Sequence, residues 1–460
     1  MRTTNNDKRT TKLAVLGAGE SGVGAALLAK AKGLEVFVSD GGQIKEVYKA
    51  KLEAAAIPFE EGGHTFERIL EATQIIKSPG IPDKVPVIQE AVKREIPIIS
   101  EIEFAGRYTD ARFICITGTN GKTTTTLLTY HLLREAGINV ALAGNIGESL
   151  AEKVIENKYD YYVVELSSFQ LDNMYQFKAH IAVLTNITPD HLDRYEYSMD
   201  KYAASKLRVA QNMTGTDFFI YNADDENISK AFQSNAFGGT AVPFSLQGAE
   251  KAKITLEGQR VKVNLPYYEG NVDISESSLI GKHNQYNTMA AVAVAKLLSI
   301  DDAAIAQALA TFQNADHRLQ TVGEAKGVTY INDSKATNVE AVWYALEGIK
   351  QPIIWIAGGV DKGNDYSTLQ ELAREKVKVL ICLGKDNEKL QQAFGKVVPI
   401  IAETTSIGYA VRLSRSLAEP GDVVLLSPAC ASFDLFNNYE HRGQQFKEAV
   451  EKIVLKNNQE

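Results

Sequence analysis

GTNGKTT, at residues 118–124, follows the β-branched run FICIT at 113–117. Leu128, Leu132 and Ala136 come next at four-residue spacing, which is typical of a helix. Strand, glycine-rich turn and helix in this order predict a phosphate-binding loop, because free amides and a helix N-terminus attract anions. In such a loop Lys122 reaches the outer phosphates and the hydroxyl of Thr123 can ligate Mg²⁺.

The predicted loop is shorter than the common P-loop. Two residues separate Gly118 from Gly121, whereas four precede the Gly-Lys pair in that motif, so its first glycine would fall on Ile116. A plain strand-to-helix turn is the alternative interpretation. The strand before and the helix after the loop favour a short variant of the phosphate cradle.

The bulk composition is that of an ordinary globular protein. The 460 residues are 45% hydrophobic and 23% charged, which predicts about three domains. A net charge of −8 argues against non-specific binding to nucleic acid or to anionic membranes. We expect a monomer whose partners are small molecules.

The cysteines and the N-terminus point to the cytoplasm. Cys115, Cys382 and Cys430 are far apart and form neither a metal-binding spacing nor a disulfide framework. The first residues, MRTTNNDKRTTK, lack the apolar core of a signal peptide, and no apolar run approaches the ~18 residues of a membrane span.

Strand-like and helix-like stretches alternate along the chain, which predicts an α/β protein with mostly parallel sheets. We expect a Rossmann-like domain at 1–108, a P-loop-type domain at 109–316 and a second Rossmann-like domain at 317–460. In the last domain, the polar loops 332–338, 357–363 and 427–434 each follow a predicted strand. Ligands bind at the carboxyl ends of strands in open α/β sheets, so these loops indicate a site.

A second glycine motif lies near the N-terminus. Gly17, Gly19 and Gly22 form GxGxxG between a predicted strand and helix, and Asp40 ends the next strand. This is the dinucleotide-binding pattern, with an acidic residue placed for a ribose. A UDP-sugar offers the same diphosphate and sugar hydroxyls as NAD, so the motif leaves the two ligands open.

A set of further motifs extends across all three predicted domains. The set comprises GTNGKTT (118–124), GNIG (144–147), ELSSFQL (165–171), NITPDHLDRY (186–195), Lys206, GKHNQYN (281–287), HR (317–318) and DSKAT (333–337). Together they resemble the Mur ligase family, the bacterial ATP-dependent amide ligases that build the peptidoglycan stem peptide. The resemblance covers nearly the whole chain.

Three segments, SPGI (78–81), NDSKATN (332–338) and LSPACASFDLF (426–436), are most similar to the members that add D-glutamate to UDP-N-acetylmuramoyl-L-alanine. The implied reaction transfers the γ-phosphoryl group of ATP to the alanyl carboxylate, and the D-glutamate amine attacks the resulting acyl phosphate. It would serve cytoplasmic peptidoglycan synthesis, and so cell wall biogenesis, cell shape and cell division. The alternatives are a sister ligase adding another amino acid, an NAD-dependent oxidoreductase and a non-catalytic nucleotide-binding protein.

The resemblance also implies site residues. Those for ATP are Gly118, Thr119, Asn120, Gly121, Lys122, Thr123, Thr124, Asn284, Arg318 and Asp333. Those for the UDP substrate are Gly17, Gly19, Gly22, Asp40, Ser78, Gly80, Asn145, Ser168 and His191. Those for D-glutamate are Lys335, Thr337, Lys362, Ser432 and Tyr439. Tyr439 departs from the family pattern, which often has phenylalanine there.

Catalysis is assigned by the same resemblance to Lys122, His191 and Lys206, with ATP and two Mg²⁺ ions. The implied metal ligands are Thr123, Glu165, His191 and Lys206. The resemblance implies that Lys206 is carbamylated, because CO₂ on its neutral amine would turn a cation into an anion. From composition alone Lys206 is a lysine on a helix surface.

Overall fold

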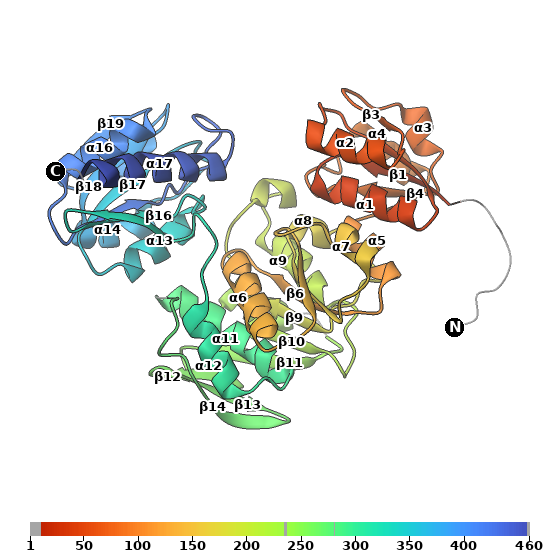
Figure 1. The fold of residues 1–460 in the computed structure, drawn as a ribbon, viewed down its shortest axis with the longest axis horizontal. Helices are drawn as coiled ribbons and strands as arrows, with labels where there is room; N and C mark the ends of the chain where they lie inside the picture. The colour runs from red at the N-terminus through yellow and green to blue at the C-terminus, as the bar shows by residue number, and fades with distance from the viewer. Residues whose placement is uncertain (1–10, 234–236, 280, 458–460) are drawn as a thin grey trace. The chain divides into compact units, whose positions relative to one another are not determined.

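A computed structural model describes residues 11–233, 237–279 and 281–457 of the chain (Figure 1). The polar residues 1–10, used above to argue against a signal peptide, lie outside the described residues. The chain separates into two compact units. One contains the residues up to Ser277 together with Tyr286–Phe312, and the other contains Ser278–Gln285 and the residues from Gln313 onward.

The first unit begins with a five-stranded parallel sheet. Its strands are β1 (Lys12–Leu16), β2 (Glu35–Ser39), β3 (Phe59–Glu60), β4 (Gln74–Lys77) and β5 (Ile98–Ile99), in the order β3-β2-β1-β4-β5. Its helices are α1 (Glu20–Ala31), α2 (Glu46–Ala54), α3 (Phe66–Leu70), α4 (Pro86–Lys93) and α5 (Glu101–Ala105). All pairings are parallel, so β1 is buried on both faces and is apolar throughout Leu13–Leu16.

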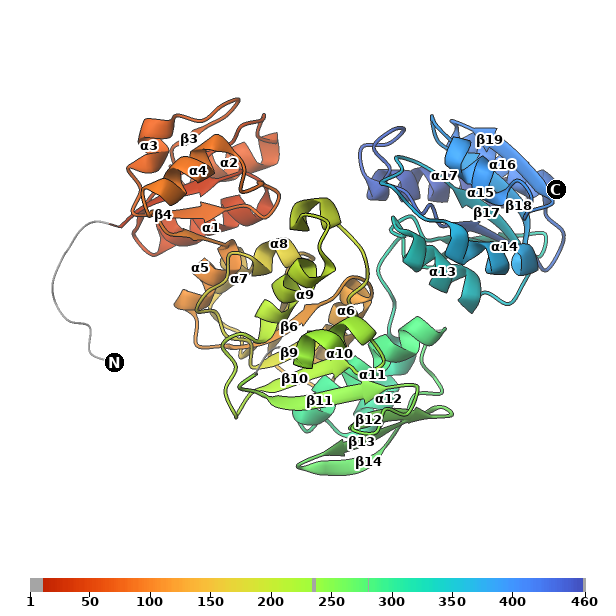
Figure 2. The ribbon, with the colours of Figure 1, turned by 180° about the vertical axis from the view of Figure 1, so that it is seen from behind.

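A nine-stranded sheet follows in the same unit, in the order β14-β13-β12-β11-β10-β9-β6-β8-β7. Its strands are β6 (Arg112–Thr117), β7 (Val140–Gly144), β8 (Tyr161–Glu165), β9 (Ile181–Leu184), β10 (Phe218–Asn222), β11 (Thr240–Ser245), β12 (Ile254–Glu257), β13 (Arg260–Leu265) and β14 (Tyr268–Asp273). Strands β6 to β11 pair in parallel, and β12 joins β11 in parallel. Beyond it, β12, β13 and β14 pair antiparallel with one another at one edge of the sheet (Figure 2).

Seven helices accompany the nine-stranded sheet. They are α6 (Lys122–Glu135), α7 (Leu150–Glu156), α8 (Ser168–Leu171), α9 (Met199–Leu207), α10 (Glu226–Gln233), α11 (Lys282–Leu297) and α12 (Asp302–Thr311). Helix α6 begins at Lys122, immediately after the glycine-rich turn, as the sequence predicts. Leu128 and Leu132 face its buried side, and Ala136 caps its C-terminus.

The two sheets of the first unit are packed together through helices. Helix α1 lies against α7 (Figures 1 and 2), and a β-carbon at Gly24 of α1 would lie 1.8 Å from Ser149 Oγ, at the start of α7. Lys51 Nζ also bonds Glu152 Oε1 at 2.7 Å. The absence of a side chain at Gly24 is therefore needed for this helix contact.

The second unit contains a six-stranded sheet in the order β15-β16-β20-β17-β18-β19. Its strands are β15 (Gln320–Ala325), β16 (Val328–Asn332), β17 (Ile353–Ala357), β18 (Val377–Leu383), β19 (Ile400–Thr404) and β20 (Val423–Leu426). Its helices are α13 (Val339–Gly348), α14 (Gln370–Lys376), α15 (Glu388–Phe394), α16 (Ile407–Leu417) and α17 (Tyr439–Asn457). Only β15 pairs antiparallel among these strands, so the predicted α/β class with mostly parallel sheets is confirmed.

None of the described helices is both long enough and apolar enough to cross a bilayer.

Candidate active site

The glycine-rich turn connects β6 to α6 and needs its glycines. Gly118 and Gly121 have φ angles of 150° and 80°, which L side chains rarely adopt. A β-carbon at Gly118 would lie 1.9 Å from Thr185 Oγ1, and one at Gly121 would lie 2.3 Å from Asn287 Oδ1. The turn is therefore shaped by close neighbours on both sides.

Hydrogen bonds fasten this turn to the segment after β9. Thr119 N donates to Asn186 O at 3.0 Å, and Asn120 N donates to Asn186 Oδ1 at 2.8 Å. In return, Thr185 Oγ1 donates to Asn120 O at 2.6 Å. Lys122 Nζ folds back onto the carbonyls of Gly118 and Thr119, at 2.9 and 2.7 Å. Its ammonium is thus held at the loop, where a phosphate oxygen could replace the carbonyls as acceptor.

Lys206 reaches the same loop from α9. Its side chain is buried, and its Nζ donates to Gly118 O at 2.7 Å while lying 4.7 Å from the centre of the Tyr202 ring. Burial, reinforced by the charge of Lys122, lowers the pKa of Lys206 well below its ordinary value. The structure therefore places at the phosphate loop a lysine whose charged form is destabilised by burial.

Glu165 ends β8 and is 1% exposed. Its Oε1 accepts a hydrogen bond from Asn145 Nδ2 at 2.7 Å, which brings together two residues that the sequence assigns to metal and substrate. Its Oε2 is buried and has no hydrogen-bond partner among the residues that the structure describes. An unpartnered buried carboxylate oxygen is costly, and a divalent cation would satisfy it, so Glu165 fits a metal ligand.

His191 lies after β9, in a segment with left-handed backbone geometry (φ 51°). Its ring packs edge-on against Phe169 at 5.2 Å, and its Nε2 lies 3.7 Å from Asp190 Oδ2. Within residues 11–233, 237–279 and 281–457, no group of three His, Cys, Asp or Glu is arranged to hold a metal. The predicted ligand set contains only two residues of these types, Glu165 and His191, besides Thr123 and Lys206.

The GxGxxG motif at residues 17–22 forms another loop, at the carboxyl edge of the five-stranded sheet. Asp40 organises it, because Ala18 N donates to Asp40 Oδ2 at 2.7 Å and Gly42 N donates to Oδ1 at 2.8 Å. A β-carbon at Gly22 would lie 1.9 Å from Gly17 O, so the helix approaches the loop closely. The structure thus brings Asp40 and the predicted glycines together, and it gives the carboxylate one backbone partner in this loop, Ala18 N, and a second in the turn after β2, Gly42 N.

Five of the predicted residues of the second unit lie on loops that follow β16, β17 and β20, namely Asp333, Lys335, Thr337, Lys362 and Ser432. Asn284 lies on α11, Arg318 precedes β15 and Tyr439 begins α17. Asp333 is buried, and its Oδ2 accepts a 2.8 Å bond from Ser427 Oγ. Burial raises the pKa of Asp333 to about 7. Lys335 Nζ lies 5.3 Å from the centre of the Tyr439 ring. The remaining predicted residues of this unit differ in exposure, with Asn284 and Ser432 buried, Arg318 and Thr337 half-buried, and Lys362 exposed.

Arg442 was not predicted, although it joins these loops. It is 1% exposed, and its guanidinium donates to Ser334 O at 2.8 Å, Cys430 O at 3.2 Å and Gly358 O at 3.4 Å. Tyr202 was also missed. Its hydroxyl is 3.1 Å from Thr119 Oγ1, and its position four residues before Lys206 on one helix face was the available signal.

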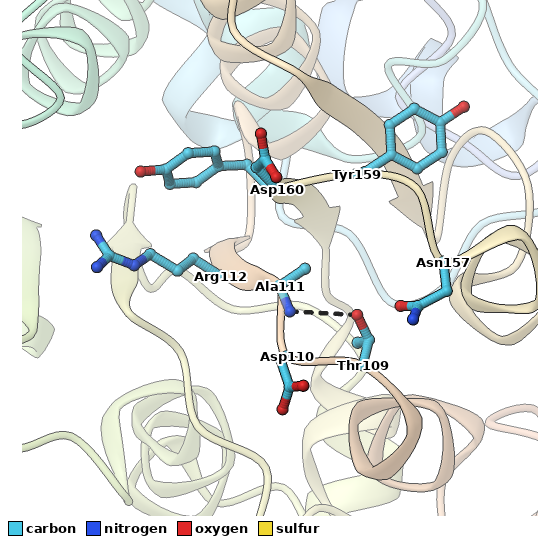
Figure 3. A pocket seen from close by; sticks show the side chains of 8 residues that line it. Thr109, Asp110, Ala111, Arg112, Asn157, Tyr159 and Asp160 are labelled. Carbon is cyan, nitrogen blue, oxygen red and sulfur yellow. Dashed lines mark hydrogen bonds between the residues drawn. The ribbon is translucent and has the colours of Figure 1, made fainter.

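Each of the two units contains a cavity. One, of about 390 Å³, lies where β6 and β8 begin and is lined by residues 109–112, 157 and 159–161 (Figure 3). Arg112, Asp110 and Tyr159 point in different directions there, so no polar groups converge on a ligand. The other, of about 350 Å³, includes Gly359, Asp361 and Cys430 of the second unit.

Comparisons with known proteins cover all three sheets. Residues 11–100 match the Mur ligase MurD-like N-terminal domain, residues 116–295 the Mur ligase middle domain, and residues 317–430 the Mur ligase glutamate ligase domain.

Relatives named UDP-N-acetylmuramoylalanine--D-glutamate ligase align with nearly the whole chain. One from Porphyromonas gingivalis is 53% identical over 449 residues, and one from Christiangramia forsetii is 50% identical over 442 residues. Each alignment covers 96% of this chain and 99% of the relative.

A solved structure of a UDP-N-acetylmuramate-alanine ligase from Thermotoga maritima is similar in fold. It is 20% identical, with a TM-score of 0.62 over 96% of this chain and 99% of that chain. Identity of 50% or more along whole relatives, with matches in every part of the chain, shows that this protein belongs to the Mur ligase family.

Proposed function

We propose that this protein adds D-glutamate to UDP-N-acetylmuramoyl-L-alanine at the expense of ATP, through an acyl phosphate. The names of its relatives support this substrate pair. The observation that carries the proposal is that Lys122 and Lys206 both donate to the carbonyl oxygen of Gly118. Two ammonium groups repel each other at one acceptor, which favours a charged Lys122 for phosphate and a neutral Lys206 for carbamylation.

Carboxylates are poor electrophiles, so a leaving group has to be made first. In the proposed reaction the alanyl carboxylate attacks the γ-phosphorus of ATP, and the bond to the bridging oxygen breaks to release ADP. The D-glutamate amine then forms the amide bond, losing a proton as inorganic phosphate departs. The main tasks of Lys122 and of the amides at 118–124 are neutralising charge and aligning the reacting groups.

Mg²⁺ would supply charge neutralisation for the phosphates and the acyl phosphate. We propose Thr123, Glu165, His191 and carbamylated Lys206 as the residues that would hold two such ions. Carbamylation joins the neutral Lys206 Nζ to the carbon of CO₂ and releases one proton, leaving an anionic oxygen pair. The unpartnered Oε2 of Glu165 supports the same assignment.

The remaining assignments follow the resemblance to the family. We propose that the loop at 17–22, with Asp40, Ser78 and Gly80, binds UDP, and that Asn145, Ser168 and His191 bind the muramoyl-alanine part. We assign Asn284, Arg318 and Asp333 to the nucleoside of ATP, and Lys335, Thr337, Lys362, Ser432 and Tyr439 to D-glutamate. Cations and hydroxyls suit a dicarboxylate. Domain boundaries at 108 and 316, a monomeric state and a cytoplasmic location complete the proposal.

Phosphate release tests the reaction. Purified protein with Mg²⁺, ATP and UDP-N-acetylmuramoyl-L-alanine is given D-glutamate, L-glutamate, L-alanine or no amino acid. Release that requires both the nucleotide sugar and D-glutamate is expected. Release with another amino acid would instead identify a sister ligase, and no release under any combination would overturn the proposed reaction.

A further inference from the structure

The loop after β4 is bonded by cations from both sheets of the first unit. Lys77 Nζ donates to Ile81 O at 3.1 Å, and Arg194 Nη2 donates to the same oxygen at 3.3 Å. Lys77 ends β4, whereas Arg194 belongs to the 3₁₀ turn Leu192–Tyr195 that follows His191. The carbonyl of Ile81 is thus a point at which the two sheets are connected.

Arg194 is held in place by an aromatic ring that also contacts His191. The guanidinium carbon of Arg194 lies 4.2 Å from the centre of the Phe169 ring, and the His191 ring packs edge-on against Phe169 at 5.2 Å. Arg194 N also donates to His191 O at 3.0 Å. Side-chain stacking and a backbone bond therefore fix Arg194 relative to His191.

The other end of the loop after β4 contacts the GxGxxG motif at residues 17–22. Ser78 Oγ donates to Gly17 O at 3.3 Å, and a β-carbon at Gly17 would lie 2.6 Å from Ser78 Oγ. The loop at 78–81 therefore makes two contacts. Ser78 contacts the glycine loop at 17–22, and Ile81 contacts Arg194. This series of contacts joins the proposed UDP loop to the segment that carries His191.

We infer that Arg194 is a positioning residue that fixes the distance between the UDP loop and His191. The inference rests on the proposed function, in which one nucleotide-sugar substrate extends from residues 17–22 to His191. A substrate bound at both ends is sensitive to small errors in that distance. In the proposed site ATP and D-glutamate are held mainly by other loops, and His191 would reach the phosphates of ATP through Mg²⁺, so their binding depends less on the Arg194–Ile81 bond than binding of the nucleotide sugar does.

The test compares Arg194→Met and Arg194→Lys with the matched variant Arg68→Met. Arg68 also stacks on a phenylalanine, with its guanidinium carbon 3.6 Å from the centre of the Phe37 ring. It is exposed on helix α3, which accompanies the five-stranded sheet. Calorimetry gives the Kd of UDP-N-acetylmuramoyl-L-alanine without turnover. Steady-state kinetics gives a KM for each of the three substrates, and thermal unfolding checks that each variant is folded.

Arg194→Met is expected to raise both Kd and KM for the nucleotide sugar by about tenfold while KM for ATP and for D-glutamate stays within about twofold. Arg194→Lys should recover part of this loss, because an ammonium can still donate to Ile81 O. Arg68→Met should bind like the wild type. Unchanged nucleotide-sugar binding by Arg194→Met, or an equal rise in KM for all three substrates, would overturn the inference.

Failure of the proposed function is recognised separately, in the wild-type protein. Absence of D-glutamate-dependent phosphate release there rejects the reaction, and the calorimetric Kd then decides the role of Arg194 without turnover. A wild type that does not bind UDP-N-acetylmuramoyl-L-alanine would reject both.

Discussion

Lys206 Nζ lies 2.7 Å from the carbonyl oxygen of Gly118, so a lysine from α9 is in direct contact with the phosphate loop. Burial is the largest cause of the lowered pKa of Lys206. Only the neutral form of an amine adds CO₂, so the lowered pKa, which burial rather than this contact causes, supports the proposed carbamylation.

With ¹³C-labelled bicarbonate, the wild type should show a carbamate carbonyl signal in its NMR spectrum. The signal should disappear on acidification, because carbamates lose CO₂ when protonated, and should be absent from Lys206→Arg. That variant should also lose about a hundredfold or more in kcat, because its guanidinium stays cationic and cannot ligate Mg²⁺. A labelled signal that persists in Lys206→Arg would place the carbamate on another residue.

Glu165→Gln should separate stability from activity. The substitution preserves the size of the side chain and an acceptor for Asn145, but it removes the charge from the buried, unpartnered Oε2. We expect kcat to fall about a hundredfold and the thermal midpoint to stay constant or rise, because a desolvated charge is lost.

Phosphate release and thermal unfolding, with and without Mg²⁺ and ATP, measure both effects. Glu148→Gln is the matched control, since Glu148 is an exposed partner of Lys153 in the loop that carries Asn145. Full activity in Glu165→Gln would rule out Glu165 as a metal ligand.

Patterns of apolar residues predicted the parallel centre of each sheet. The run at 113–117 lies in β6, and the strands predicted before the loops 357–363 and 427–434 are β17 and β20, because strands covered on both faces need continuous apolar residues. The antiparallel strands β12 to β14 were not predicted. In β13, RVKVNL alternates between exposed and buried residues, a signal of period two that a search for continuous apolar runs overlooks.

Contacts between distant residues explain what else was missed. The partners of Arg442 lie on three separate loops, and Arg194 and Ile81 are 113 residues apart. No local pattern specifies such bonds, because each depends on how whole strands are arranged. By contrast, Gly118 and Gly121 could be predicted, since the motif itself requires a backbone that only glycine adopts easily.

Arg442→Met should destabilise the second unit. It would leave the carbonyls of Ser334, Gly358 and Cys430 without this buried donor, at a cost of about 3 kcal/mol or more in the free energy of unfolding. Because these carbonyls belong to the loops proposed for D-glutamate, KM for D-glutamate should rise as well.

Chemical denaturation and steady-state kinetics test this expectation. Arg412→Met is the control, because Arg412 is exposed on α16 of the same unit. Equal stability of the two variants would show that the carbonyls find other donors when Arg442 is absent.

Glu101 should make the stability of the first unit depend on pH. Its side chain is buried at the start of α5, its Oε1 accepts a bond from Ala151 N of α7, and burial raises its pKa from 4.5 to about 8. Between these values the folded state binds more protons than the unfolded state, so stability falls as pH rises from about 4.5 to 8. Glu101→Gln stays neutral and retains an acceptor for Ala151 N, so this part of the decline should be absent from the variant.

Asp333, whose pKa is raised to about 7 by burial, contributes a decline in stability of the same sign in the second unit, so the slope should be reduced but not abolished. Denaturant midpoints measured at steps between pH 5 and 8 give both slopes, and parallel slopes for wild type and variant would mean that Glu101 is already ionised in the folded protein.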